Sequence, residues 1–212
     1  MRKIALPLIL LLAGCSSSSD QPVSNLKTYS SDHFGVSIDS PYPMNFTESD
    51  MKVKGGPPVK TLMGHAENPT PKFMDIALFT IRTLAGKKGV MDIFKLDIYA
   101  HQRSAQAPDY DSKFLLNETI QRLAEIQNTK QDVKNFEHQS VPIECSGMPA
   151  TLTTGAFEIA KKNLSMHIYF QHLLVVKKKA YWQVYCTYQD LDRYGDLTKK
   201  IIQSVKIKTA GP

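Results

Sequence analysis

The chain has 212 residues, of which 42% are hydrophobic, and 26 Lys and Arg against 20 Asp and Glu give a formal net charge of +6. This length is enough for one sizeable hydrophobic core and short for two. Two of the basic residues lie in the first three positions, and basic and acidic residues interleave elsewhere, so the sequence excludes nucleic acid as an expected partner.

The first fourteen residues have the pattern of an export signal. Arg2 and Lys3 precede an apolar run over 4–12, which fits the core of a secretory signal and is too short to cross a bilayer. Leu-Ala-Gly-Cys at 12–15 resembles the bacterial lipoprotein box, in which the cysteine thiol becomes a diacylglycerol thioether and the freed amine is acylated. We therefore expect a signal peptide over 1–14 and a lipidated Cys15. A plain signal with an incidental cysteine is the alternative.

Residues 15–25 are predicted to form a lipidated, flexible tether. Ser, Asp, Gln, Pro and Asn dominate this stretch, and such a composition buries too little surface to offset the entropy of ordering. Ser16 follows the lipidated position, which in the enterobacterial sorting pattern directs a lipoprotein to the outer membrane. The expected location is the bacterial cell envelope, in the outer membrane facing the periplasm, with acyl chains such as palmitate as the anchor. One domain should follow over 26–209.

Hydrophobic periodicity predicts the elements of the first half of this domain. A hairpin or strand is expected over 29–39 with a turn near Asp32, followed by strands over 59–66 and 73–84. Apolar residues without a breaker favour a helix over 89–105. A second helix is predicted over 111–127, with Asp111 or Ser112 as its cap, and a last one over 190–204, capped by Asp190.

Four strands are predicted between the last two helices, over 136–145, 150–160, 164–176 and 180–188. Their short connections require antiparallel neighbours, so we expect a meander. In the third strand the even positions are apolar except for His172, which predicts a core face, with the other face partly covered. The fold class is therefore α+β.

Several stretches of this domain resemble the PsbP-like superfamily, which is named for an extrinsic photosystem II subunit and includes a eukaryotic Ran-binding protein and bacterial envelope lipoproteins. They are "HFGVSIDSPYP" (33–43), "SGMPATLTTGAF" (146–157), "AYWQVYCTY" (180–188) and "LTKKIIQSVKI" (197–207). The resemblance implies an antiparallel sheet flanked by helices on both sides, an α/β/α sandwich. It transfers no functional residues, because members share a scaffold without a common active site.

No catalytic constellation is visible in the sequence. The six histidines have no metal-ligand spacing, and neither a nucleophile motif nor a phosphate-binding loop is present, so we expect no catalytic residues, cofactor or metal. Cys145 and Cys186 fall on the first and fourth meander strands, too far apart for a disulfide if sheet order follows chain order. A reordered sheet would permit the bond.

Two classes of function remain. The first is a non-enzymatic envelope lipoprotein that binds or assembles a membrane-associated complex through the face with Tyr181 and Tyr185, or through the turn of Lys177, Lys178 and Lys179. The alternative is a carrier of a small molecule or lipid, with a pocket between sheet and helices. A cavity under a helix favours the carrier, whereas a solid core with exposed tyrosines and lysines favours docking.

Overall fold

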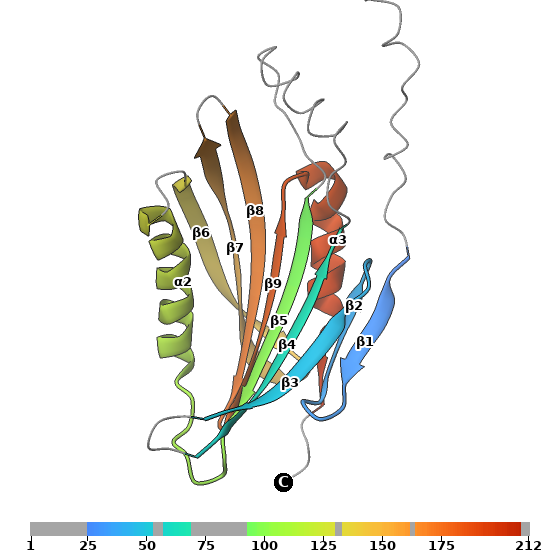
Figure 1. Ribbon diagram of the computed structural model, residues 1–212, viewed down its shortest axis with the longest axis vertical. Helices are drawn as coiled ribbons and strands as arrows, with labels where there is room; N and C mark the ends of the chain where they lie inside the picture. The colour runs from blue at the N-terminus through green and yellow to red at the C-terminus, as the bar shows by residue number, and fades with distance from the viewer. Residues whose placement is uncertain (1–24, 53–56, 69–92, 130–132, 162–163, 209–212) are drawn as a thin grey trace, which may run out of the picture.

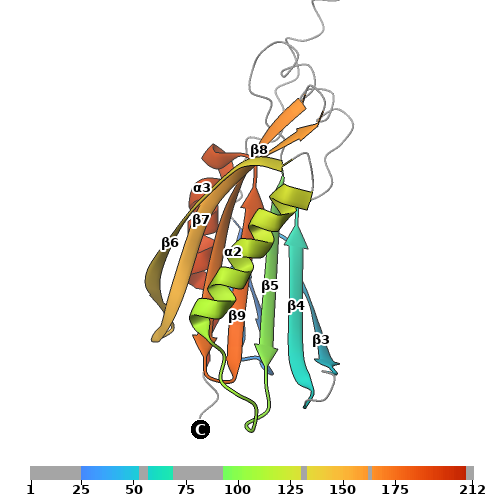
Figure 2. The same cartoon turned by 90° about the vertical axis from the view of Figure 1, so that its left-hand side faces the viewer.

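The computed structural model describes residues 25–52, 57–68, 93–129, 133–161 and 164–208. Its centre is a seven-stranded antiparallel sheet in the order β3-β4-β5-β9-β8-β7-β6, and a smaller sheet has the order β1-β2-β10. Helix α2 lies on one face of the large sheet, and α3 lies on the other (Figures 1 and 2). The predicted α+β class, with helices on both faces of an antiparallel sheet, is confirmed.

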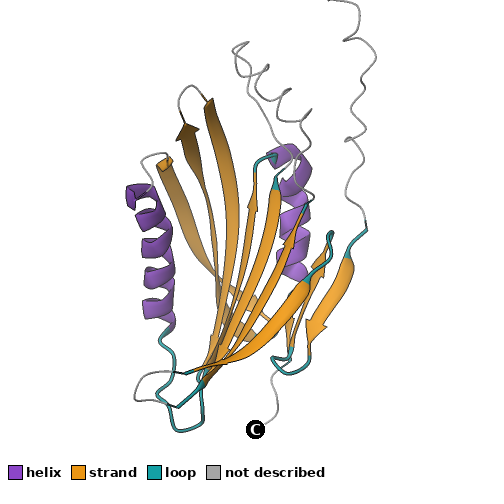
Figure 3. Ribbon diagram, in the orientation of Figure 1, coloured by secondary structure: helices purple, strands orange, loops and turns teal. Residues whose placement is uncertain are grey.

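The elements are bounded as follows: β1 Lys27–Ser31, β2 Val36–Ser40, β3 Asn45–Met51, β4 Val59–Glu67, β5 Phe94–Gln102, α2 Ser112–Thr129, β6 Val133–Cys145, β7 Met148–Lys161, β8 Leu164–Lys177, β9 Ala180–Tyr188, α3 Leu191–Ser204 and β10 Lys206–Ile207 (Figure 3). Neither helix of this described part has the length and apolar character needed to cross a membrane.

The predicted hairpin over 29–39 is confirmed as β1 and β2. The Gly35 amide donates to the Asp32 carbonyl at 3.2 Å, and Gly35 has φ +58°, which a residue with a side chain rarely adopts. A Cβ at Gly35 would lie 2.4 Å from the carbonyl oxygen of Lys208, so the turn also requires a residue without a side chain at this position.

The helix predicted over 89–105 is wrong where the structure describes it, because residues 94–102 form the strand β5 near the middle of the large sheet. Inward residues alternate with outward ones along this strand, a period of two rather than 3.6. Four inward side chains are 0% exposed: Phe94, Leu96, Ile98 and Ala100. The strand predicted over 59–66 is confirmed as β4, and the one over 73–84 lies outside the described residues.

The meander is confirmed as β6, β7, β8 and β9, each paired with the next. Ser146 and Gly147 join the first two strands with φ of 53° and 76°, as expected for a two-residue hairpin turn. Cys145 and Cys186 are buried free thiols, with two strands between their own, so the prediction of unbonded cysteines is also confirmed.

Both predicted helices after residue 105 are confirmed, together with their caps. The Asp111 carboxylate accepts from the Lys113 amide at 2.8 Å and the Phe114 amide at 3.1 Å, and the Asp190 carboxylate accepts from the Arg193 amide at 3.0 Å. These bonds satisfy amides of the first turn that have no partner within the helix.

Strand β8 is buried on both faces over residues 170–175, and the prediction that its even positions form the core face is wrong. Leu173 and Val175 lie in the main core between the large sheet, α3 and the small sheet. Phe170, His172 and Leu174 point to the opposite face, which α2 partly covers, and are buried there. The even positions therefore do not form the main core.

Candidate functional site

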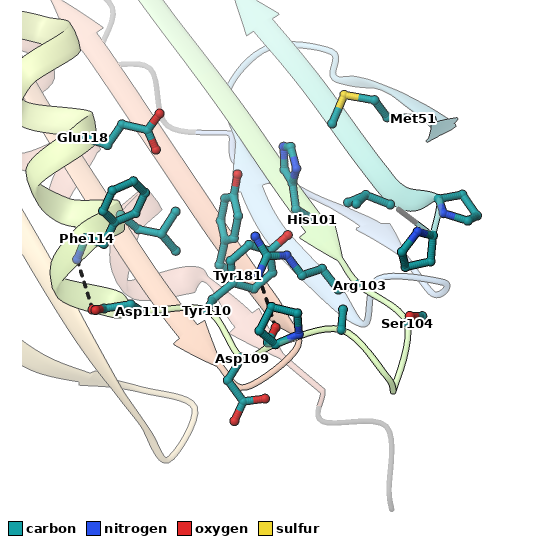
Figure 4. Close-up of a pocket in the computed structure, with 16 residues that line it drawn as sticks. Met51, His101, Arg103, Ser104, Asp109, Tyr110, Asp111, Phe114, Glu118 and Tyr181 are labelled. Carbon is teal, nitrogen blue, oxygen red and sulfur yellow. Dashed lines mark hydrogen bonds between the residues drawn. The ribbon is translucent and has the colours of Figure 1, made fainter. Parts of the chain in front are cut away.

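A cavity of about 580 Å³ lies between the large sheet and the start of α2. Figure 4 shows its walls: β5 and β9 at the back, the segment 103–111 below, α2 on one side, and the ends of β3 and β4 on the other. We call this space the outer chamber. Its volume falls within the range of small-molecule sites, about 300–1,000 Å³.

Aromatic rings form the back wall of the outer chamber (Figure 4). The Tyr181 ring is stacked on His101 with centroids 4.7 Å apart and planes at 11°, and it meets the edge of Tyr110, also at 4.7 Å. The Arg103 guanidinium lies 3.8 Å from the Tyr110 ring centroid. Each ring is fixed by another, so the wall is preorganised to receive a planar apolar group.

The back wall is uncharged at neutral pH apart from Arg103. Burial raises the pKa of Tyr181 to about 12 and also raises the pKa of Tyr110. Burial, aided by the neighbouring Arg103 charge, lowers the pKa of His101. The wall therefore offers neutral hydrogen-bonding groups and one cation.

The β8–β9 turn with Lys177, Lys178 and Lys179, which we call the lysine turn, positions the lower rim of the outer chamber. The amides of Arg103 and Tyr110 donate to the carbonyls of Lys179 and Lys178, at 2.8 and 2.7 Å. The Lys179 ammonium forms a 2.7 Å ion pair with Asp109. The segment 103–111 is thus tied at both ends to the β8–β9 turn.

A second, smaller space of about 180 Å³ continues from the outer chamber along the sheet under α2. We call it the inner chamber. Leu115, Glu118 and Tyr181 line both chambers, which together form what we call the α2 cleft. The Gln183 side-chain amide donates to the Thr119 hydroxyl at 3.0 Å, which connects the sheet to the helix across the inner chamber.

His172 lines the inner chamber and is 2% exposed. Within the described part of the chain, neither of its ring nitrogens has a hydrogen-bond partner. Burial lowers the pKa of His172 to about 4, and burial also raises the pKa of the neighbouring Tyr185. Both side chains are therefore neutral at physiological pH.

A basic groove of about 930 Å³ lies beside the α2 cleft, between the β1–β2 turn, the end of β5 and the β8–β9 turn. Lys177, Lys178 and Lys208 are exposed on its lining, and Trp182 donates from its indole nitrogen to the Phe34 carbonyl at 3.1 Å. Asp32 is the acidic residue among its lining side chains.

The structure separates the residues that the sequence singled out. Tyr181 and Tyr185 are partly buried and line the α2 cleft, whereas Lys177 and Lys178 are exposed at the β8–β9 turn. Lys179 supports the rim of the cleft. Cys15 lies outside the described residues.

Sequence reasoning missed His101, Arg103 and Tyr110. His101 and Arg103 both fall within the segment 89–105 predicted to be helical, which hid their position at and just after the end of β5. Strict alternation from Phe94 to Ala100 was the signal that could have found the strand. Nothing in the sequence indicated that 103–111 folds back over Tyr181.

No group of three or more His, Cys, Asp or Glu side chains in the described ranges is placed to hold a metal ion. His65 contacts two carboxylates, Asp97 at 2.5 Å and Glu67 at 3.4 Å, but through opposite ring nitrogens. These three side chains therefore do not converge on one point.

No protein-family model and no curated protein matches this chain. Among solved structures, the chain is similar to the solution structure of cyanobacterial PsbP from Synechocystis sp. PCC 6803, at 9% identity and a TM-score of 0.48, over 93% of this chain and 99% of that one. It is also similar to the crystal structure of PA94 from Pseudomonas aeruginosa, a protein of unknown function, at 10% identity and a TM-score of 0.35, over 89% and 99%. Neither similarity brings a function to this chain.

Proposed function

We propose that this chain is a bacterial envelope lipoprotein with a PsbP-like domain, anchored through Cys15, whose α2 cleft binds a small amphipathic molecule with a planar ring. The observation that carries the binding proposal is the wall of Tyr181, His101 and Tyr110 at the back of a cavity of ligand size. Apolar cavities with a few fixed polar groups are the usual form of small-molecule sites.

The chemistry of the cleft selects the ligand class. A planar ring lies against Tyr181, while polar groups at its outer end meet Arg103 and Asp109 on the rim. The buried end of the cleft offers neutral imidazole, phenol and amide groups rather than charges. The cleft therefore suits a molecule with an uncharged inner end and a polar outer end, and the role proposed is binding without catalysis.

Truncating the aromatic wall should weaken binding. Tyr181→Ala removes the ring that stacks with His101 and should reduce affinity for the neutral fluorescent probe N-phenyl-1-naphthylamine by about tenfold, the loss of one buried aromatic contact. Tyr181→Phe keeps the ring and should change the affinity by about twofold or less. Fluorescence titration of the full-length protein in lipid nanodiscs, with empty nanodiscs subtracted, measures both.

Circular dichroism of each Tyr181 variant shows whether its fold is intact, so that a loss of binding can be assigned to the missing side chain rather than to unfolding. If Tyr181→Ala keeps its fold and binds the probe as the wild type does, the outer chamber is not the binding site. If Tyr181→Phe loses binding as completely as Tyr181→Ala, stacking is not the source of affinity.

A second candidate function, docking on a membrane-associated protein complex, is favoured by the exposed Lys177 and Lys178 beside the basic groove. Tyr181 and Tyr185 lie under α2, so the lysine turn is the part of the expected docking surface that stays accessible. A tether of about ten residues spans roughly 15–20 Å, so such a partner is itself membrane-bound or in the adjacent periplasm.

Reversing the charge of this turn tests the docking function. Lys177→Glu with Lys178→Glu should release the protein complexes that co-purify with the wild type from solubilised envelopes, because the groove loses its positive potential. The control is Lys200→Glu with Lys206→Glu, which reverses the same number of exposed lysines away from the groove. Equal recovery of the complexes with both double variants would exclude the lysine turn.

A further inference from the structure

His172 is the polar side chain of the α2 cleft that most needs a partner. Its ring is 2% exposed and lines the inner chamber, and no described residue forms a hydrogen bond with either ring nitrogen. Buried polar atoms without a partner within the protein are rare, and a water, an ion or a ligand commonly completes them. His172 lines the inner chamber, so a group bound there is a candidate partner for its ring.

The size of the inner chamber limits what can enter it. Its volume is about 180 Å³, and a cavity of roughly 150 Å³ in another protein is known to hold one benzene molecule. The chamber therefore takes one six-membered ring. The rest of the ligand continues into the outer chamber past Leu115 and Tyr181, which line both spaces.

The walls of the inner chamber exclude a charged ring. The titratable groups on the strands are Tyr99 of β5, Tyr181 and Tyr185 of β9, and His172 of β8, and burial shifts the pKa of each toward its neutral form. The two charged groups belong to α2, where Glu118 and Arg122 pair with each other at 2.6 Å. A carboxylate or ammonium placed beside His172 would therefore lack a free counter-charge among these groups.

Neutral imidazole donates through one ring nitrogen and accepts through the other. A hydroxyl group can serve either nitrogen, because it also both donates and accepts. We propose that the inner chamber binds an uncharged, hydroxyl-bearing aromatic ring, and that His172 selects this phenol-type group by a hydrogen bond to its hydroxyl. This inference rests on the proposed function and deepens it by naming the chemical class at the buried end of the ligand.

Three ring-sized probes separate the alternatives: 4-fluorophenol, fluorobenzene and 4-fluorobenzoate. Ligand-observed fluorine NMR on the full-length protein in lipid nanodiscs, with empty nanodiscs as the blank, gives their affinities. We expect 4-fluorophenol to bind about fivefold or more tightly than either other probe, as one added hydrogen bond allows.

Variants of His172 assign the preference to its ring. His172→Leu keeps a similar volume and removes both nitrogens, so it should lower the affinity for 4-fluorophenol by about fivefold and change that for fluorobenzene by about twofold or less. His172→Gln restores a donor and an acceptor and should recover part of the phenol preference. His138→Leu, at an exposed histidine, should behave as the wild type.

Three results overturn the inference: equal binding of fluorobenzene and 4-fluorophenol, tightest binding of 4-fluorobenzoate, or a phenol preference that survives in His172→Leu. Any of these, with N-phenyl-1-naphthylamine binding that still depends on Tyr181, leaves the proposed function in place. A wild type that binds neither the ring probes nor the fluorescent probe overturns both.

Discussion

Lowering the pH from 6.5 to 4 should cost the folded domain about 3 kcal/mol of stability through His172 alone. Burial lowers the pKa of this histidine from 6.5 to about 4. Below pH 6.5 the unfolded chain takes up a proton that the folded chain refuses until the pH nears 4. The unfolded state then binds more protons, so the free energy of unfolding falls as the pH falls, by about 1.36 kcal/mol for each unit of the pKa difference.

Urea unfolding at pH 7, 5.5 and 4 gives the free energy of unfolding of the wild type and of His172→Leu. The contribution of His172 is the difference between the losses of the two proteins as the pH falls. The variant should lose about 3 kcal/mol less than the wild type over this range. At pH 7 it should be at least as stable, because its leucine leaves no polar atom unpaired. The exposed histidine variant His138→Leu is the control and should follow the wild type. Parallel curves for wild type and His172→Leu would show that His172 titrates normally.

Replacing Cys15 with serine should release the protein from membranes almost completely. Each buried CH₂ of an acyl chain contributes about 0.8 kcal/mol to membrane binding, and two or more chains anchor stably. The Ser side chain cannot form the thioether, so the variant would have no acyl anchor. Fractionation of cells followed by immunoblotting of membrane and soluble fractions measures the change.

Ser18→Ala, within the same expected tether, is the matched control and should stay with the membrane fraction. Intact mass of the detergent-extracted wild type should show the added diacylglycerol and acyl chain. A Cys15→Ser protein that is still processed and still sediments with membranes would contradict lipidation at this position.

The meander and the two capped helices could be predicted from sequence because their signals are local. Short connections such as the one at Ser146 and Gly147 permit one kind of neighbour, and Asp111 and Asp190 mark helix starts by side chains that bond within the same turn. In such segments, residues close together in the sequence determine the local structure, so the turn or helix start can be predicted without knowing the rest of the fold.

Strand β5 was predicted as a helix because its apolar residues fit both the strand period of two and the helix period of 3.6. Apolar residues alternate from Phe94 to Ala100, as in a strand, but Ile93 beside Phe94 also fits the apolar stripe of a helix. No proline or glycine lies within 93–100 to decide between the two. Pairing with β4 and β9 decides the outcome, and those strands are distant in sequence.

The α2 cleft could be anticipated only in part. Spacing by two placed Tyr181 and Tyr185 on one face, but whether that face meets water or a helix depends on where α2 packs. The stacking of Tyr181 on His101 joins residues eighty positions apart. His172 stood out as the polar interruption of an apolar face, and its lack of a partner emerged only in three dimensions.

Photolabelling of the full-length protein in its own membranes shows whether the α2 cleft is a ligand site. With 4-hydroxybenzophenone as the probe, we expect crosslinks on segment 103–115 and on β9. Thr119→Phe, which fills the inner chamber, should abolish them, while Asn117→Phe, at an exposed position of the same helix, should retain them. Crosslinks on α3 or the small sheet, or labelling that Thr119→Phe leaves unchanged, would contradict a ligand site in the α2 cleft.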